Sequence, residues 1–190
     1  MAEGKKNARR RQAWIVFQDE SGLSLTPPLR RTWAPRGQTP VLRFHFNWKR
    51  LSMAAALAYR CDGATSRLVF ATRAGAYNDV TLIEFITQLR RHLRGDKATL
   101  LWDGLPSHRS RAMRAFLLTQ RHWLVVERLP AYAPDLNPVE ALWGNIKGQE
   151  LANLCAENLD ETLDAATDGI TRVRHRRLAF AFLHQAGLSL

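Results

Sequence analysis

The chain has 190 residues, 46% of them hydrophobic, which is enough for one domain around its own core. Its formal net charge of +11 at pH 7 favours a polyanionic partner, nucleic acid first, although a generally basic protein without such a partner stays open. The cysteines Cys61 and Cys155 form no CxxC pair, which excludes zinc-ribbon and thioredoxin-like sites. No apolar run reaches the roughly 18 to 20 residues of a membrane span and no signal-type stretch follows the N-terminus, so we expect a cytoplasmic protein.

The N-terminal part is expected to hold a basic arm, a buried strand and a loop. Residues 1–12 are polar, strongly basic and without periodicity, which predicts a flexible arm. Residues 13–18 (AWIVFQ) are a short apolar run rich in β-formers, which predicts a buried strand that ends at Asp19. Residues 21–40 contain four prolines and two glycines and are expected to be mostly turn.

The rest of the chain reads as three strands followed by alternating helices and strands. Apolar and polar residues alternate over 41–48, which predicts a half-exposed strand in an antiparallel meander with 51–59 and 65–72. The elements expected next are a helix over 79–94, a strand over 98–102, a helix over 107–122, a strand over 123–129, a helix from about 137 and a helix over about 159–176.

This order predicts an α/β fold in a single domain over residues 13–190. Its sheet is expected to be mixed and five-stranded, with three antiparallel strands followed by two parallel ones, and to be flanked by helices. The same order of elements occurs in the ribonuclease H-like fold, although an order of elements supports a fold only weakly.

Two carboxylates follow predicted strands. Asp19 comes after AWIVFQ and Asp103 comes after ATLLW. Because residues just past strand ends of an α/β sheet converge on one crevice, the two side chains can share a site. Taken singly, each is better explained as an aspartate in the turn that leaves a strand than as a ligand.

A third carboxylate, Glu140, lies in the segment YAPDLNPVEALW. Asn137 can cap a helix whose first residue is Pro138, which puts Glu140 in its first turn. Local chemistry favours a capping box, in which Glu140 returns to the backbone N–H of Asn137. The combination with Asp19 and Asp103 favours the other interpretation, because carboxylates held close together gather around a hard cation such as Mg²⁺.

Four segments resemble the catalytic core of IS630-type bacterial transposases, which are related to Tc1/mariner elements. They are DESG, WAPRGQTP, LLWDGLPSHRS and LPAYAPDLNPVEALWGNIK, and they occur in the family's order. The resemblance implies a ribonuclease H-like fold and a DDE triad of Asp19, Asp103 and Glu140 that is both catalytic and metal-binding. It also implies two Mg²⁺ ions, with Mn²⁺ as a substitute, that serve hydrolysis at transposon ends and transfer of the freed 3′-hydroxyl into target DNA.

The same resemblance suggests further residues. His108 matches a histidine that the family often carries, which suggests contact with a phosphate or with a carboxylate beside the metal; a histidine at a helix start without a catalytic role is the open alternative. Arg109, Arg111 and Lys147 are candidate contacts to DNA phosphates, each with a solvated surface charge as the alternative. Gly104 departs from the family's usual asparagine, which puts a hydrogen bond from that position in doubt.

Members of this family carry helix-turn-helix modules ahead of the catalytic core, and only the basic arm stands there in this sequence. We therefore expect DNA as partner and either a homodimer on DNA or association with the product of an upstream DNA-binding reading frame. A bacterial, nucleoid-associated location follows. Two alternatives stay open: another ribonuclease H-like nuclease, and a catalytically silent DNA-binding remnant or partner subunit of a split transposase.

Overall fold

A five-stranded mixed sheet forms the centre of the molecule in the computed structural model, which describes residues 2–45, 48, 50–130 and 133–190. The strands lie in the order β3-β2-β1-β4-β5. The pairs β1–β2 and β2–β3 are antiparallel, whereas β1–β4 and β4–β5 are parallel, so the predicted sheet is confirmed. The strands are β1 (Trp14–Leu23), β2 (Leu51–Arg60), β3 (Ser66–Ala74), β4 (Ala98–Trp102) and β5 (Leu124–Arg128).

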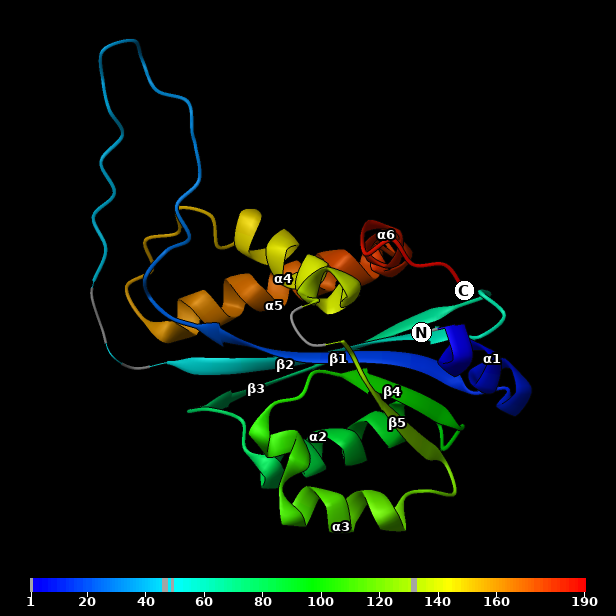
Figure 1. Ribbon diagram of the computed structural model, residues 1–190. Coiled ribbons are helices and arrows are strands. Elements are labelled where there is room, and N and C mark those ends of the chain that lie inside the picture. Colours follow the sequence, from blue (N-terminus) through cyan, green and yellow to red (C-terminus); the bar gives the residue numbers. More distant parts are fainter. Residues whose placement is uncertain (1, 46–47, 49, 131–132) are drawn as a thin grey trace.

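Helices cover both faces of this sheet (Figure 1). The helices and 3₁₀ turns are α1 (Ala2–Arg11), α2 (Asp79–His92), η1 (Pro106–Arg109), α3 (Arg111–Thr119), η2 (Pro134–Leu136), α4 (Pro138–Gly148), α5 (Leu159–His175) and α6 (Ala179–Gln185). Helices α4, α5 and α6 lie on one face, and α2 and α3 lie on the other. Because both faces are covered, β4 is buried at all five positions.

The alternation of side chains along the strands divides the core into two clusters. Ile15 and Phe17 of β1 belong to the cluster that packs under α4, α5 and α6. Trp14 and Val16 belong to the cluster that packs against α2 and α3. Odd-numbered residues of β1 therefore face α4, and even-numbered residues face α2 and α3.

The N-terminal segment differs from its prediction. A flexible arm is expected over residues 1–12, but residues 2–11 form helix α1. Ala8 of this helix is fully buried, and its carbonyl accepts a hydrogen bond from the backbone N–H of Ala13 at 2.9 Å. Burial of the Ala8 side chain thus fixes helix α1 on the body of the protein, although the polar, basic composition of this segment predicts no helix.

The connection between β1 and β2 also differs. The strand predicted to end at Asp19 continues to Leu23, because β2 pairs with it as far as Leu23↔Leu51. The strand expected over 41–48 is wrong for residues 41–45 and 48, which lie outside the strands of the sheet, and residues 46 and 47 lie outside the described part.

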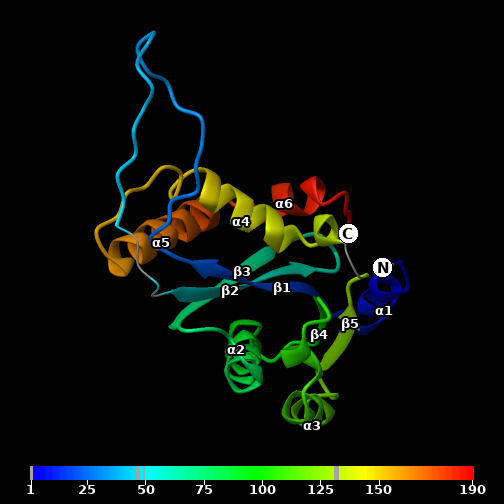
Figure 2. The same cartoon turned by 60° about the vertical axis from the view of Figure 1, so that its left-hand side comes forward.

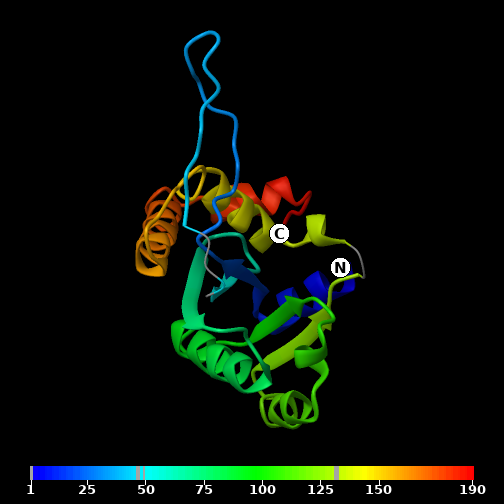
Figure 3. The ribbon, with the colours of Figure 1, turned by 90° about the vertical axis from the view of Figure 1, so that its left-hand side faces the viewer.

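Between these two strands the chain forms a long extended loop, called the excursion below, whose described part includes residues 24–45. It stands away from the sheet in Figures 1, 2 and 3. Its root is tied to the body by Asn153, whose side chain accepts a hydrogen bond from the N–H of Arg30 and donates one to its carbonyl, both at 2.9 Å. Large apolar side chains along it are exposed, and Trp33 is 100% exposed.

Within the part of the chain that the structure describes, none of the helices has the length and apolar character needed to cross a membrane.

The C-terminal helix α6, which the sequence does not predict, packs on the sheet, where the Tyr59 hydroxyl donates to the carbonyl of Ala179 at 2.7 Å.

Candidate active site

The register of two parallel strands brings Asp19 and Asp103 side by side. The last pair of the β1–β4 ladder is Phe17↔Leu101, and each aspartate lies two residues beyond its strand's member of that pair. By alternation, Asp19 points to the α4 face of the sheet. There its Oδ2 accepts a hydrogen bond from the indole Nε1 of Trp143 on α4 at 3.0 Å.

Helix α4 brings the third carboxylate to the same edge. Asn137 caps the helix, its side chain accepting from the N–H of Val139 at 3.2 Å, as its sequence predicts. The N–H of Asn137 donates instead to the carbonyl of Pro134 at 2.8 Å, so it is not free for the side chain of Glu140. The capping-box alternative for Glu140 is therefore wrong, and its exposed side chain is available to the cleft.

All three predicted carboxylates line one cleft of about 790 Å³. Its walls come from the ends of β1 and β4, the loop to η1, the segment after β5, and the start of α4. The lining residues are Asp19, Asp103, Gly104, Leu105, Pro106, Arg109, Arg128, Leu129, Pro130, Ala133, Pro134, Asn137 and Glu140. Glu140 also lines a second hollow of about 550 Å³ that follows α4.

The electrostatics of this cleft centre on Asp19. Its pKa is raised to about 7, first by burial and then by the charges of Glu140, Glu20 and Asp103, while the hydrogen bond from Trp143 acts in the opposite direction. Neighbouring carboxylates thus hinder the ionisation of Asp19. The lowest-energy way to keep all of them charged is to place a cation among them.

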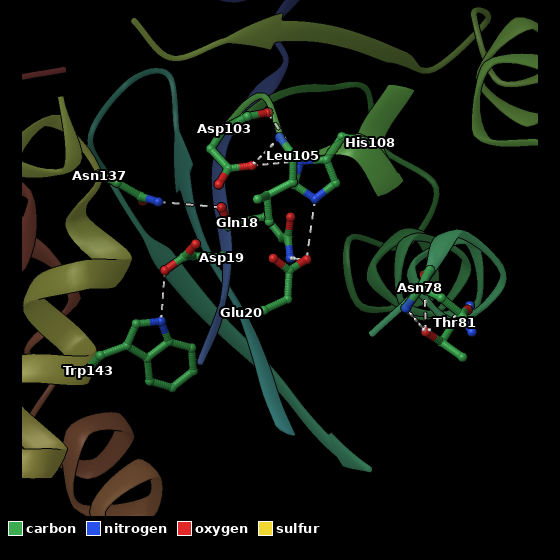
Figure 4. A network of polar contacts seen from close by, with 10 residues as sticks. All are labelled: Gln18, Asp19, Glu20, Asn78, Thr81, Asp103, Leu105, His108, Asn137 and Trp143. Carbon is green, nitrogen blue, oxygen red and sulfur yellow. Dashed lines mark hydrogen bonds and ion pairs between the residues drawn. The ribbon is translucent and has the colours of Figure 1, made fainter. Parts of the chain in front are cut away.

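Asp103 is held in a different manner. Its Oδ1 accepts from the backbone N–H of Leu105 at 3.0 Å and lies 2.8 Å from Nδ1 of His108 (Figure 4). Burial would raise the pKa of Asp103, but the hydrogen bonds from His108 and Leu105 outweigh it and lower the pKa. Burial would likewise lower the pKa of His108, but its hydrogen bonds to Asp103 and Glu20 raise it to about 9.

This donor set suits a hard divalent cation. The three side chains offer only carboxylate oxygens, and the raised pKa of Asp19 marks a local excess of negative charge. Among the described residues, no three His, Cys, Asp or Glu side chains form a group that could hold an ion by itself. Mg²⁺ has no need of such a cage, because it is commonly held by one or two carboxylates together with water and substrate phosphate.

The candidate DNA contacts separate in space. Arg109 lines the cleft, and so does Arg128, which no sequence motif marks as a contact. Arg111 is exposed at the start of α3 and does not line the cleft. The amine of Lys147 donates to the hydroxyl of Ser21 at 2.7 Å, beside a separate cavity of about 240 Å³ near the root of the excursion.

His108 is only 4% exposed and its ring stacks on Trp102, which leaves little access for the DNA phosphate that is one of its predicted contacts. The other predicted role, contact with a carboxylate of the site, is the one the structure has. The partners that sequence reasoning missed are Glu20 and Trp143, which belong to the motif segments but carry no local signal of their contacts.

Comparison with known proteins assigns the chain to a family. Residues 14–162 match the DDE superfamily endonuclease family, a segment that contains all three carboxylates. The chain belongs to this family, as its motifs predict. No curated protein matches the sequence.

Among solved structures, the fold is similar to the Mos1 strand transfer complex, with a TM-score of 0.64 and 18% identity over 96% of this chain. It is also similar to the Mos1 mariner paired-end complex with Mn, with a TM-score of 0.54 and 22% identity over 94% of this chain. The chain spans 55% and 59% of the length of these two chains. A simian T-cell lymphotropic virus intasome matches with a TM-score of 0.54 and 13% identity, over 85% of this chain and 48% of that chain. These similarities confirm the predicted ribonuclease H-like fold.

Proposed function

We propose that this chain is the catalytic domain of a DNA transposase, which hydrolyses phosphodiesters at transposon ends and transfers the resulting 3′-hydroxyl into target DNA. The observation that carries the proposal is the single cleft lined by Asp19, Asp103 and Glu140. The fold shared with the Mos1 strand transfer complex supports the second step, and the family supports the first.

The site would hold two divalent cations, Mg²⁺ or, as a substitute, Mn²⁺. Their protein ligands would be the carboxylates of Asp19, Asp103 and Glu140. The similar Mos1 complex with Mn supports the choice of metal. A pair of such ions activates the attacking oxygen on one side of the phosphorus and stabilises the leaving oxygen on the other.

The protein's own contribution is to fix these carboxylates and to receive the DNA. Trp143 holds one oxygen of Asp19, and His108 with Leu105 holds one oxygen of Asp103, so each carboxylate keeps its second oxygen for a cation. Arg109 and Arg128 line the same cleft and supply positive charge for a phosphate backbone. The net charge of +11 favours association with DNA as a whole.

DNA, both transposon end and target, is the proposed substrate and partner. This chain covers 55% and 60% of two Mos1 chains, and a homodimer or association with the product of an upstream DNA-binding frame would assist specific recognition. In a bacterial cell the protein would then act at the nucleoid.

The test is a cleavage assay on a duplex that carries the element's own terminal sequence, with Mg²⁺, Mn²⁺ or EDTA. We expect metal-dependent nicking by the wild type and a loss of at least about 100-fold in Glu140→Gln, because one ligand of the metal site is removed. Glu84→Gln, a change at an exposed glutamate of α2, serves as the matched control and should keep full activity.

Two results would contradict the proposal. A preference for RNA–DNA hybrids or four-way junctions over the terminal duplex would assign the chain to another nuclease function. Tight, salt-sensitive DNA binding without cleavage under either metal would assign it to a silent DNA-binding role.

A further inference from the structure

A cluster of polar side chains, Gln18, Glu20 and His108, lies on the face of the sheet opposite to the face toward which the Asp19 side chain points. Gln18 and Glu20 flank Asp19 on β1, and alternation turns both toward the α2 and α3 face. His108 lies on that side as well and connects Glu20 to Asp103 (Figure 4). Glu20 is not among the residues that line the cleft.

The His108 ring is held by stacking and by contacts at both of its nitrogens. It stacks on the buried Trp102 with ring centroids 4.0 Å apart and an interplanar angle of 2°. Nδ1 lies 2.8 Å from Oδ1 and 3.1 Å from the carbonyl oxygen of Asp103, and Nε2 lies 3.4 Å from Oε1 of Glu20. The side chain is 1% exposed, so water does not compete for either nitrogen.

Glu20 is placed to fix Nε2. Its Oε1 accepts a hydrogen bond from the Gln18 amide at 2.9 Å, while its Oε2 and the Oε1 of Gln18 are buried without a partner in the part of the chain described. Burying a carboxylate with an unsatisfied oxygen disfavours folding. Because the unsatisfied oxygen of Glu20 lowers the stability of the fold, a role of Glu20 in the site accounts for this residue better than a role in stability does.

We propose that Glu20 is a positioning residue that orients the carboxylate of Asp103 through His108. If the chain acts as proposed above, this orientation serves metal binding. With Nε2 tied to Glu20, Nδ1 is directed at Oδ1 of Asp103, and the N–H of Leu105 completes the hold on that oxygen. Figure 4 shows the other oxygen turned away from His108.

A competing explanation is electrostatic, because the charge of Glu20 also acts on Asp19. The two explanations make opposite demands on residue 20. Positioning requires a polar group that reaches Nε2 of His108, whether charged or not. A field effect requires a negative charge, whether or not it reaches the ring.

Three substitutions separate these demands. Glu20→Gln keeps length and hydrogen bonding but removes the charge, Glu20→Asp keeps the charge but shortens the reach, and Glu20→Met keeps the volume but removes both. The measurement is the Kd for Mn²⁺ from titration by electron paramagnetic resonance, with the purified chain and no DNA. Thermal unfolding followed by circular dichroism confirms that each variant is folded.

We expect Glu20→Gln to bind Mn²⁺ like the wild type, whereas Glu20→Asp and Glu20→Met bind about 10-fold or more weakly, the range seen when a group that orients a metal ligand is lost. The same weakening should appear in His108→Ala, and adding Glu20→Met to His108→Ala should have no further effect, because the two act in one chain of contacts. Glu84→Gln is again the exposed control.

Wild-type affinity in Glu20→Asp with weak binding in Glu20→Gln would overturn positioning in favour of the field effect. Equal affinities of Glu20→Gln and Glu20→Met would also overturn it, and this comparison holds even if Glu20→Asp does not fold. A wild type that binds no Mn²⁺ and does not cleave the terminal duplex with it would instead overturn the proposed function. Binding that depends on Asp19 but not on residue 20 would leave the function standing and remove only the role of Glu20.

Discussion

The carboxyl group of Asp19 illustrates how a proposed metal ligand can oppose folding. Burial and three neighbouring carboxylates raise its pKa to about 7, so the folded chain holds this proton more tightly than the unfolded chain, whose aspartates have a pKa near 3.8. The native state therefore binds the extra proton between pH 3.8 and about 7. Stability contributed by this group falls as pH rises through that window and stays low above it.

We predict that Asp19→Asn stabilises the metal-free protein at pH 8. The pKa difference corresponds to at most about 4 kcal/mol, of which relaxation should leave about 1 to 3 kcal/mol. Asparagine can still accept the hydrogen bond from Trp143. The measurement is urea unfolding in EDTA at pH 8 and at pH 4, where the gain should nearly vanish.

The matched control is Asp168→Asn at an exposed position of α5, which should leave stability unchanged. Adding Mg²⁺ should stabilise the wild type but not Asp19→Asn. The cation offsets the repulsion among the carboxylates by binding to them, and this binding needs the carboxylate of Asp19. A lower unfolding free energy for Asp19→Asn than for the wild type in EDTA would show that the ionised carboxylate of Asp19 does not oppose folding.

At this scale the sequence predicts the residues better than their contacts. Asp19, Asp103 and Glu140 stand in motif segments, and the structure brings them to one cleft. The hydrogen-bonded role of His108 depends on Glu20, which is 88 positions away in the chain, and no local pattern encodes such a pair. Arg128 likewise reaches the cleft only because β5 pairs with β4.

Among the elements, helix α4 has the most direct influence on the site, because its first turn carries Glu140. Asn137 does two things at its start: it caps the helix, and its amide donates to the carbonyl of Gln18 on β1 at 3.5 Å. The second contact ties the helix start to the strand that carries Asp19.

We predict that Asn137→Ala lowers stability by about 1 kcal/mol, as the loss of a helix cap does, and lowers cleavage activity by more than that loss explains. Asn158→Ala is the matched control, because Asn158 caps α5 by accepting from the N–H of Glu161 at 2.9 Å. It should show a similar loss of stability with full activity. Equal activities of the two variants, measured well below their melting temperatures, would contradict a role for Asn137 in placing Glu140.

Element prediction succeeds where the signals are local. Helix α2 begins at the Asn78 cap, and α5 ends within one residue of its predicted end at 176. Residues 41–45 show the limit: their alternating pattern is compatible with a strand, but a strand forms only by pairing with the backbone of another strand.

For the whole molecule, the order of elements predicts the mixed sheet, but not the excursion between β1 and β2. Described residues 24–45 of this segment have no helix or strand, and the turn Pro35–Gln38 is closed by a 3.0 Å hydrogen bond with Gly37 at φ +84°. A proline-rich composition predicts irregular backbone, but whether such a segment packs on the body or leaves it depends on tertiary contacts.

We predict that trypsin cuts this excursion first, because proteases need extended, exposed backbone that is free of secondary structure. Four exposed arginines lie within its residues 24–45, at positions 30, 31, 36 and 43. The nicked chain should stay in one piece in gel filtration, because β1 and β2 on either side of the cut are joined through ten residue pairs, Trp14↔Arg60 to Leu23↔Leu51. Mass spectrometry of the earliest fragments locates the cut. First cleavage within the arginine-rich helices α2 or α5, or separation of the two fragments without denaturant, would contradict this arrangement.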